Sequence, residues 1–423
     1  MRHRWLLCLP VGLFVVSICG AEFQVNTHTA NDQKSAGIAM DRGGNFVVVW
    51  SSYLQDGSSN GVFARRFDPN CSPLGDEIQI NTTTAGNQTE PAVAMDATAG
   101  FVVAWQGPGL IDAGEDIFLR RFDPNGLPLG DDFCAGYATD AQIYPSVAVN
   151  VDGSFAVVWE SVNLPQAGDR SVCARLYDSN GVGLGEELVI NDAPAVCRYP
   201  DIAADANGNF AVAWMEDKSS NSVMARLFNA DGSSRGDAFE VSTIRFSSVT
   251  KPSIAMDDAG FFVVAWDGDP NLAGQDDIHA RLFDPNGTPL GEQFVVNTAL
   301  GGAQQYPQAA MNGRGEFVIV WESRIDPNNA NERDIFGQRF DSLSVPVGDE
   351  FQVNTFVEGE QRNSAVAMGE DGRFVAVWQS DAQDSSRYGI FGETGPIAGS
   401  ADLNGDEQGL AEFSRQWLTT RDQ

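Results

Sequence analysis

One segment near the C-terminus has the residue types and spacing of a calcium loop. Asp402, Asn404 and Asp406 supply side-chain oxygens at positions one, three and five of the segment DLNGDEQG, and loops of this spacing wrap oxygen ligands around a calcium ion. Two departures weaken the pattern. Glu407 stands where the sharp turn needs glycine, and the closing acid, Glu412, stands at position eleven instead of twelve. We therefore expect these residues either to bind calcium weakly or to form a polar turn before a short helix.

Three carboxylates form a second group of candidate ligand-binding residues. Glu160, Asp267 and Glu322 each follow directly on a tryptophan that ends a run of apolar residues. If these runs are equivalent strands around one axis, the three carboxylates emerge together near that axis, where they can hold a cation or act as acid and base. Carboxylates also cluster readily in a chain with 58 Asp and Glu residues. The sequence therefore predicts a ligand-binding role for the three and no catalytic residue.

Histidine and cysteine offer little chemistry. Only two histidines remain after the first 20 residues, far apart in the chain, so neither a histidine-based triad nor a zinc cluster is expected. Four cysteines remain as well, and they allow three complete disulfide pairings in an oxidising compartment. We favour a local bridge between Cys173 and Cys197, which flank one predicted hairpin, over pairings that involve Cys71 and Cys134.

The elements that position these residues belong to a sevenfold repeat. Seven tryptophans close seven apolar runs of the type FVVVW, at spacings of 55, 54, 55, 52, 55 and 57 residues. A fixed period of this length is the signature of a repeat architecture. The tryptophans are Trp50, Trp105, Trp159, Trp214, Trp266, Trp321 and Trp378.

Each repeat contains four short segments rich in β-branched and aromatic residues and bounded by turn residues. In the first copy they are residues 38–41, 46–50, 62–68 and 77–82, which predicts a four-stranded antiparallel meander. The tryptophan strand is apolar at every position, so both of its faces are covered, as in blades stacked face to face. The first strand carries alanine in every copy, which suits crowding around a central axis. The pattern predicts an all-β, seven-bladed β-propeller over residues 22–394.

The phase of the repeat predicts how the ring closes. The segment EFQVNT at residues 22–27 is a fourth strand without its first three, and the last copy ends with its third strand at residues 389–393. The N-terminal strand should therefore complete the seventh blade and remove two free sheet edges. The tight turns after strands one and three fall on one face, and the longer, more variable loops fall on the other, which is the face we expect to bind a partner.

Charge recurs with the same period. Acidic residues lie across the hairpin from arginines of the third strand, which predicts an ion pair repeated in each blade. The arginines are Arg65, Arg120, Arg175, Arg226 and Arg281, and the acids are Asp76, Asp131, Glu186, Asp237 and Glu292.

The N-terminus and the net charge restrict the setting. Residues 1–20 combine two arginines, an apolar run and small residues before Ala21, which is typical of a signal peptide. Its removal takes away two positive charges and no acid, so the formal charge changes from -32 to -34. Such a surface repels phosphate, which argues against nucleic acid as a partner, and no later stretch is long enough for a membrane span. We expect a secreted monomer, extracellular or periplasmic.

Two resemblances agree with this reading. Residues 22 to about 393, with their segments FQVNT, IAMD, FVVVW and FARRFD, resemble a family of secreted bacterial proteins with tandem repeats, which implies a propeller-like extracellular module and no transferable activity. Residues 395–423 resemble one degenerate half of a dockerin with its EF-hand-like loop, which implies calcium as the possible cofactor and an attachment role.

The sequence leaves two functions open. The first is a non-catalytic binding or scaffold module that engages a polysaccharide or a protein through the long-loop face. The second is an extracellular hydrolase or lyase that acts on glycan through carboxylates of the central pocket. The pocket should discriminate between them, because an enzyme needs convergent polar residues that differ from blade to blade, whereas a module should show seven near-equivalent positions.

Overall fold

The computed structural model describes most of the chain after residue 21. The described residues are 22–110, 114–136, 141–162, 169–192, 195–217, 221–243, 251–269, 276–299, 302–324, 333–384 and 387–395. The predicted signal peptide and the calcium-loop residues Asp402, Asn404, Asp406 and Glu412 lie outside them. None of the described residues forms a helix that is long and apolar enough to cross a membrane.

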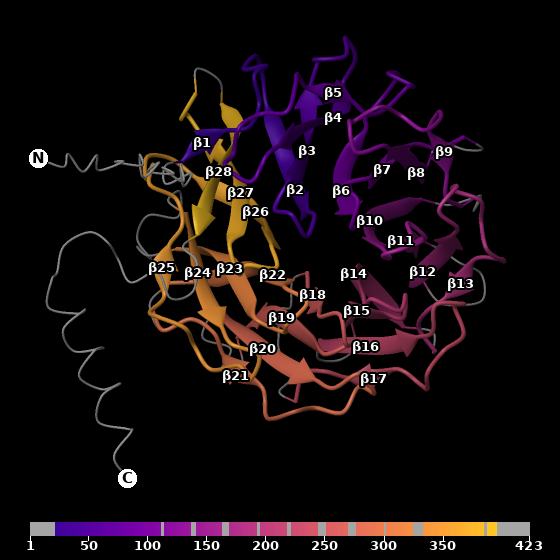
Figure 1. The fold of residues 1–423 in the computed structure, drawn as a ribbon, viewed down its shortest axis with the longest axis vertical. Helices are drawn as coiled ribbons and strands as arrows, with labels where there is room; N and C mark the ends of the chain where they lie inside the picture. The colour runs from indigo at the N-terminus through magenta and orange to yellow at the C-terminus, as the bar shows by residue number, and fades with distance from the viewer. Residues whose placement is uncertain are drawn as a thin grey trace, which may run out of the picture.

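The described chain forms seven four-stranded antiparallel sheets around one axis (Figure 1). This is the predicted seven-bladed β-propeller. The inner strands are β2 (Gln33–Met40), β6 (Thr89–Met95), β10 (Gln142–Val149), β14 (Val196–Ala204), β18 (Ser253–Met256), β22 (Gln304–Met311) and β26 (Gln361–Met368). The second strands are β3 (Phe46–Tyr53), β7 (Phe101–Pro108), β11 (Phe155–Val162), β15 (Phe210–Asp217), β19 (Phe262–Gly268), β23 (Phe317–Ser323) and β27 (Phe374–Asp381).

The third strand of each blade is about as long as the second, and the fourth strand is much shorter. The third strands are β4 (Asn60–Phe67), β8 (Glu115–Phe122), β12 (Arg170–Tyr177), β16 (Ser222–Phe228), β20 (Asp277–Phe283), β24 (Asp334–Phe340) and β28 (Tyr388–Gly395). The outer strands have two residues each: β5 (Ile78–Gln79), β9 (Phe133–Cys134), β13 (Leu188–Val189), β17 (Phe239–Glu240), β21 (Phe294–Val295), β25 (Phe351–Gln352) and β1 (Phe23–Gln24).

The core lies between the blades. Each of seven apolar clusters combines side chains from two neighbouring sheets. The seven repeated tryptophans are among the largest fully buried side chains, as expected for a strand that is covered on both faces. Burial of this aromatic surface supplies much of the free energy that joins one blade to the next.

The N-terminal strand closes the ring. Strand β1 pairs with β28, with Phe23 opposite Gly392 and Gln24 opposite Phe391, and the Val25 N–H donates to the Ile390 carbonyl at 2.8 Å. The predicted closure is confirmed. The first and last described strands therefore share one sheet (Figure 1).

The repeated arginines have partners other than those predicted. Their guanidinium groups donate to backbone carbonyls that follow the outer strand of the preceding blade, as Arg65 does to Val25 at 2.9 Å and Arg120 does to Ile80 at 2.7 Å. Each arginine thus links two blades through a charge-assisted hydrogen bond, and the prediction of an ion pair across the hairpin is wrong. The other three pairs are Arg175 with Ala135, Arg226 with Ile190, and Arg281 with Val241.

The favoured disulfide is also wrong. Cys173 lies on β12 of the third blade and Cys197 on β14 of the fourth, in different apolar clusters. No disulfide joins the four cysteines of the described residues. The two residues flank a blade boundary instead of a hairpin, which is why their nearness in sequence misled the prediction.

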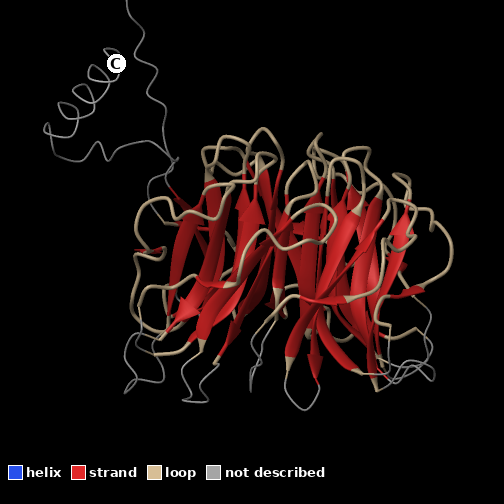
Figure 2. Ribbon diagram, turned by 90° about the horizontal axis from the view of Figure 1, so that it is seen from below, coloured by secondary structure: helices blue, strands red, loops and turns tan. Residues whose placement is uncertain are grey.

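The connections after the first and third strands lie on one face of the disc, and those after the second and fourth strands lie on the other (Figure 2). We call these the face of the tight turns and the face of the long connections, as predicted from the sequence. The predicted difference in length holds for the turns after the first strands, such as residues 41–45, but it is wrong for the connections after the third strands, because residues 68–77 outnumber residues 54–59 between the second and third strands of the same blade. The inner strands begin at the face of the long connections and end at the face of the tight turns. Each inner strand therefore presents its first residues at one opening of the central channel and its last residues at the other.

Candidate functional site

A cavity of about 440 Å³ occupies the central channel where the seven inner strands begin. It lies at the face of the long connections and is lined by four successive residues from most of the strands. A volume of this size is in the range of small-ligand sites. The cavity defines the candidate functional site.

The mouth of the cavity is a ring of seven positions that are equivalent in the repeat. In six of the seven inner strands a shift of the pairing register, a β-bulge, falls at this position. Six of the seven residues have a left-handed backbone, with φ between 49° and 56°. Non-glycine residues in this conformation are strained and gather at functional sites. The mouth ring consists of Ser35, Glu90, Tyr144, Tyr199, Lys251, Tyr306 and Asn363.

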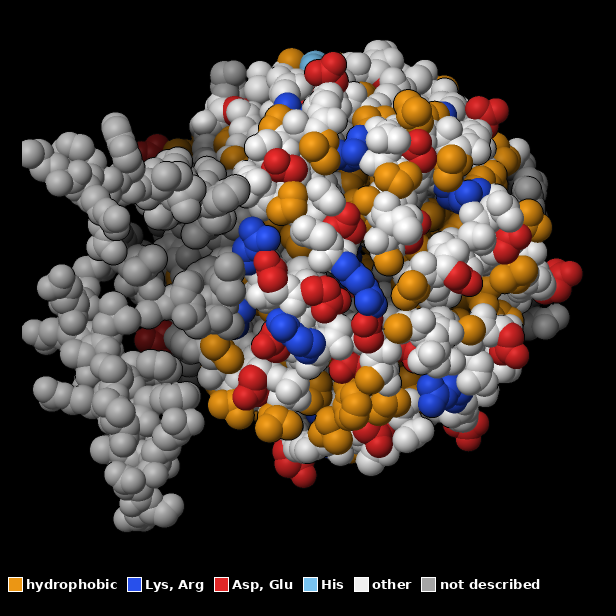
Figure 3. Space-filling view, in the orientation of Figure 1, with side chains coloured by type: hydrophobic (Ala, Val, Ile, Leu, Met, Phe, Trp, Pro, Cys, Tyr) orange, Lys and Arg blue, Asp and Glu red, His pale blue; other side chains and the backbone are white. Residues whose placement is uncertain are grey.

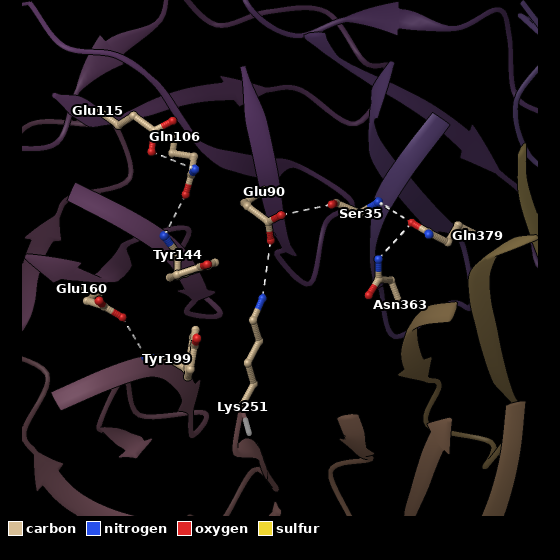
Figure 4. Close-up of polar contacts among 10 residues, drawn as sticks. All are labelled: Ser35, Glu90, Gln106, Glu115, Tyr144, Glu160, Tyr199, Lys251, Asn363 and Gln379. Carbon is tan, nitrogen blue, oxygen red and sulfur yellow. Dashed lines mark hydrogen bonds and ion pairs between the residues drawn. The ribbon is translucent and has the colours of Figure 1, made fainter. Parts of the chain in front are cut away.

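Side chains from behind the ring hold these strained residues in place. The Tyr144 N–H donates to the Gln106 amide oxygen at 3.0 Å, and the Asn363 N–H donates to a Glu322 carboxylate oxygen at 2.8 Å. The Tyr199 N–H lies 3.3 Å from a carboxylate oxygen of Glu160 (Figure 4). Each acceptor sits directly after the tryptophan of the preceding blade. The repeat thus supplies a fixed support for a ring whose own side chains vary.

The predicted ligand-binding carboxylates belong to this supporting layer. Glu160, Asp267 and Glu322 have exposed fractions of 0%, 1% and 1%, so the expectation that they emerge at the axis is wrong. Glu160 also pairs with Arg170, and Glu322 pairs with Arg333. Burial raises the pKa of Glu322, although the charge of Arg333 opposes that rise. Glu160 and Glu322 thus have a supporting role, in which they accept hydrogen bonds from backbone N–H groups of the mouth ring.

The charged residues of the ring meet each other across the mouth. Lys251 of the fifth blade lies 3.4 Å from a carboxylate oxygen of Glu90 in the second blade, and Ser35 donates to the same carboxylate at 3.2 Å (Figure 4). The Lys251 ammonium also lies 4.6 Å from the centre of the Tyr144 ring and 5.8 Å from that of Tyr199. Burial raises the pKa of Tyr144, and the nearby Tyr199 and Glu90 add to that rise. Tyr144 therefore stays protonated and can donate a hydrogen bond.

A second ring of equivalent residues, two positions further along each inner strand than the mouth ring, lies deeper in the cavity. Asp201 accepts hydrogen bonds from the Ser146 hydroxyl at 2.7 Å and from the Ile254 N–H at 2.9 Å. Burial raises the pKa of this carboxyl group above its ordinary value, even though these hydrogen bonds oppose the rise. Below this ring the floor is apolar and includes Ile38 and Val93. The cavity thus combines an aromatic and charged mouth, one carboxyl group with a raised pKa and an apolar floor.

The far end of the channel has a different character. A separate cavity of about 170 Å³ lies at the tight turns. There Arg42 of the first blade makes a bidentate ion pair with Asp258 of the fifth, with both distances at 2.7 Å. Acidic and basic side chains meet around the axis on the face turned to the reader in Figure 3. This cross-channel ion pair narrows the opening at the tight turns, so a ligand has its freer access from the opposite face.

Within the described part of the chain, no group of three or more His, Cys, Asp or Glu side chains is arranged to hold a metal ion. The tail residues predicted to bind calcium are outside that part, so the calcium prediction stays a prediction.

Fold and cavity together define a seven-bladed β-propeller with a ligand-sized pocket on its axis. The sequence matches no protein-family model and no curated protein. Among solved structures, it resembles a polysaccharide lyase of family 25, an ulvan lyase, with a TM-score of 0.54 and 10% identity over 90% of this chain and 96% of that one. It also resembles a protein of unknown function from Dyadobacter fermentans, with a TM-score of 0.52 and 10% identity over 89% and 98%.

A fungal alcohol oxidase with bound copper is similar as well, with a TM-score of 0.53 and 14% identity over 89% of this chain and 76% of that one. The lyase and the oxidase have different described activities at similar levels of likeness to this chain. At such low identity the resemblance shows the propeller fold alone.

The sequence reasoning missed the mouth ring, although a signal for it was present. Five of the seven ring residues stand directly before a proline near the start of the inner strand. In a repeat whose other strand positions barely change, this position holds Glu90, Tyr144, Tyr199, Lys251 and Tyr306. Variation at one strand position of a strict repeat indicates that folding does not dictate the side chain there.

Proposed function

We propose that the protein binds an extracellular polysaccharide at the mouth of the central channel and acts on it as a hydrolase or lyase. The observation that carries the proposal is the composition of the mouth ring. Six of its seven positions share one backbone geometry, yet the ring carries serine, glutamate, tyrosine, lysine and asparagine side chains that converge on one cavity. A scaffold that only repeats itself supplies seven similar positions, and this ring does not.

The side chains of the ring suit a sugar. Tyr144 and Tyr199 pack edge to face at 5.0 Å between ring centres and present aromatic surface together with hydroxyl groups, which is the usual combination for carbohydrate rings. Tyr306 lines the same cavity. Ser35 and Asn363 add hydroxyl and amide groups that exchange hydrogen bonds with sugar hydroxyls.

The cavity also holds a proton donor and a proton acceptor. Glycosidic bond cleavage by hydrolysis or by elimination needs one group that protonates the leaving oxygen and one that takes a proton from water or from the sugar. Asp201, whose pKa is raised by burial, is our candidate donor. Glu90, which faces the ammonium of Lys251 at 3.4 Å, is the candidate acceptor.

The proposal has support from outside the cavity. The ulvan lyase whose fold this chain resembles was solved with a bound -[GlcA(1-4)Rha3S]- oligosaccharide, so a propeller of this size accommodates glycan chemistry. The signal peptide predicted for residues 1–20 supports a substrate outside the cell. The sequence also predicted a module that binds without catalysing a reaction. That function would use the same ligand class and the same face of the disc as the proposed enzyme, but it would need no proton donor and no proton acceptor.

Activity and binding are measured together to test the proposal. The protein is incubated with a panel of neutral and acidic polysaccharides, and both reducing ends and unsaturated products are followed. We expect turnover of at least one glycan and a loss of about 10²–10⁴-fold in Asp201→Asn. Asp217→Asn, at the exposed end of β15, is the matched control and should behave like the wild type. Binding without any product would support the non-catalytic module, and the absence of both would reject a glycan ligand.

A further inference from the structure

The inner strands leave one row of backbone N–H groups directed at the channel. Each inner strand pairs only with the second strand of its own blade, so its other edge borders the axis. In the fifth blade the Ile254 N–H donates to Asp201 of the fourth blade at 2.9 Å. In the sixth blade the equivalent Ala309 N–H donates to the Ser253 hydroxyl of the fifth blade at 3.1 Å. At this strand position the N–H therefore points away from its own sheet and toward the cavity wall.

The acceptors for this row come from one position of the preceding blade. Asp201 and Ser253 occupy that position in the fourth and fifth blades, and the Ile202 N–H also lies 3.0 Å from an Asp201 oxygen. One half of the cavity wall thus has its donors satisfied by side chains. A buried donor without a partner is unfavourable, so this capping has a clear structural reason.

The other half of the wall lacks such acceptors. In the seventh, first and second blades the equivalent positions are Ala365, Gly37 and Ala92, which have no polar side-chain atom. The N–H groups opposite them belong to Ile38, Val93 and Val147, and all three residues line the cavity. Among the described residues, no side chain accepts a hydrogen bond from these three N–H groups. Three donors on three consecutive blades therefore border the same side of the pocket.

We propose that the N–H groups of Ile38, Val93 and Val147 form an anion cradle that takes the carboxylate of a uronic acid residue in the glycan. The proposal rests on the proposed function and specifies its substrate class. Successive backbone N–H groups around a concavity are a common way to bind anionic oxygens, and hydrogen bonds to a charged acceptor are stronger than those to a neutral one. A carboxylate accepts from several donors at once, whereas a sugar hydroxyl also needs an acceptor for its own proton.

The local charge permits an anion in spite of the formal charge of -32. The charged side chains that line the cavity are Glu90, Asp201 and Lys251. Glu90 is paired with Lys251, and the raised pKa of Asp201 favours its uncharged form. Glu90 lies on the second blade, two residues before Ala92, and it is the one acid among the residues that line the cavity on the side of Gly37, Ala92 and Ala365. The ammonium of Lys251 opposes the repulsion that Glu90 exerts on an anion in the cradle.

The cradle can be closed by giving it the acceptors that the other half of the wall already has. Ala92→Ser and Ala365→Ser place hydroxyls where Ser253 has one, next to the N–H groups of Val147 and Ile38. Gly37 is left unchanged, because a Cβ there would lie 3.1 Å from Val49 and 3.3 Å from the Pro91 carbonyl. Ala97→Ser, in the turn that follows β6, is the matched control.

Titration calorimetry on the full protein uses disaccharides that end in glucuronate or galacturonate, and the matched disaccharides that end in glucose or galactose. We expect the wild type and Ala97→Ser to prefer the uronates, and the double variant Ala92→Ser/Ala365→Ser to lose at least tenfold in uronate affinity with an unchanged melting temperature. Equal affinity for uronate and neutral sugars, no uronate binding by the wild type, or undiminished uronate binding by the double variant would overturn the cradle. Cleavage of a neutral glycan alone would support the proposed function and reject the cradle. Uronate binding without any cleavage would support the cradle and reject the proposed catalytic function.

Discussion

The two ends of the seven inner strands obey different rules. At the tight turns an acid or amide usually follows the strand, and its oxygen accepts the N–H four residues on, as in Asp41 with Asn45 and Asp257 with Phe261, both at 2.9 Å. At the mouth the backbone is equally regular, but the side chains differ from blade to blade. Folding therefore restricts the choice of side chain at one end of each inner strand and leaves it free at the other end.

This difference teaches where to look for function in a repeat. A position that folding requires is filled by the same residue type in each copy, because each copy solves the same packing problem. A position that is strained and still varied is maintained for another reason. The mouth ring meets both conditions. In the turns after the first strands the left-handed position is a glycine in six of the seven copies, with Ala99 as the exception, so the comparison can be tested by changing each region in turn.

Removal of residues 22–27 should have the largest effect, because both regions depend on a closed ring. The deletion exposes an edge of β28 and breaks the hydrogen bonds and apolar contacts of β1, including the packing of Phe23 and the fully buried Val25. We expect the free energy of unfolding to fall by at least about 3–5 kcal/mol. Thermal melting followed by circular dichroism measures it, and an unchanged melting temperature would show that β1 does not hold the ring closed.

Loss of a supporting carboxylate should have the next largest effect. Glu322→Ala leaves the nearly buried Arg333 without its carboxylate partner and leaves the Asn363 N–H without its acceptor. Breaking a buried pair in this way costs about 3–5 kcal/mol. Glu360→Ala, which removes a more exposed partner of Arg362, is the control and should cost less than about 1 kcal/mol. Chemical denaturation would contradict this reading if both variants were equally stable.

The pH dependence of stability should change when Asp201 is replaced. Its folded pKa is raised by burial, so the folded state holds this proton more tightly than the unfolded state. Its contribution is therefore most favourable below the unfolded pKa of about 4 and is lost as the pH rises through the folded pKa. In melting series from acid to neutral pH, Asp201→Asn should gain stability relative to the wild type as the pH rises. A constant difference between the two proteins would exclude a raised pKa.

A pair of glycine exchanges on β2 and its turn gives the smallest and sharpest test. Ser35 and Gly44, at the two ends of this strand, both have positive φ, 55° and 84°. Ser35→Gly relieves strain at the mouth and should leave stability unchanged or raise it by up to about 1 kcal/mol. Gly44→Ser forces a side chain into the left-handed region beside Pro69 and should lower stability by about 1 kcal/mol. A stability loss in Ser35→Gly as large as that in Gly44→Ser would erase the distinction between the two ends.

The fold was predictable because its constraints recur seven times. The tryptophan spacing, the alanine position and the isolated strand at residues 22–27 each indicated blades, an axis and a seam, and the structure has all three. The mouth ring could not be predicted in the same way, since its residues do not recur. Only the neighbouring proline marks its position in the chain.

The misplaced carboxylates show why the site prediction failed. Trp159 and Glu160 are successive strand residues, so their side chains point to opposite faces of the sheet. In a propeller both faces are covered by neighbouring blades, and Glu160 is therefore as buried as the tryptophan. In a sheet with one solvated face, the residue next to a buried strand residue points to solvent. That rule does not hold in a propeller, where both faces of the sheet are covered. The cysteine pair failed for a related reason, because nearness in sequence does not show which residues share a blade.

The seam between β1 and β28 also sets the order of events during synthesis. The partner of the first strand is Tyr388–Gly395, the last described strand, so the ring cannot be completed before that strand has been synthesised. Until then the waiting segment has an unpaired edge and partly exposed apolar side chains, and such species are prone to aggregation. Completion of the ring therefore depends on how quickly the two ends of a nearly 400-residue segment find each other, a search whose entropic cost grows only slowly with length.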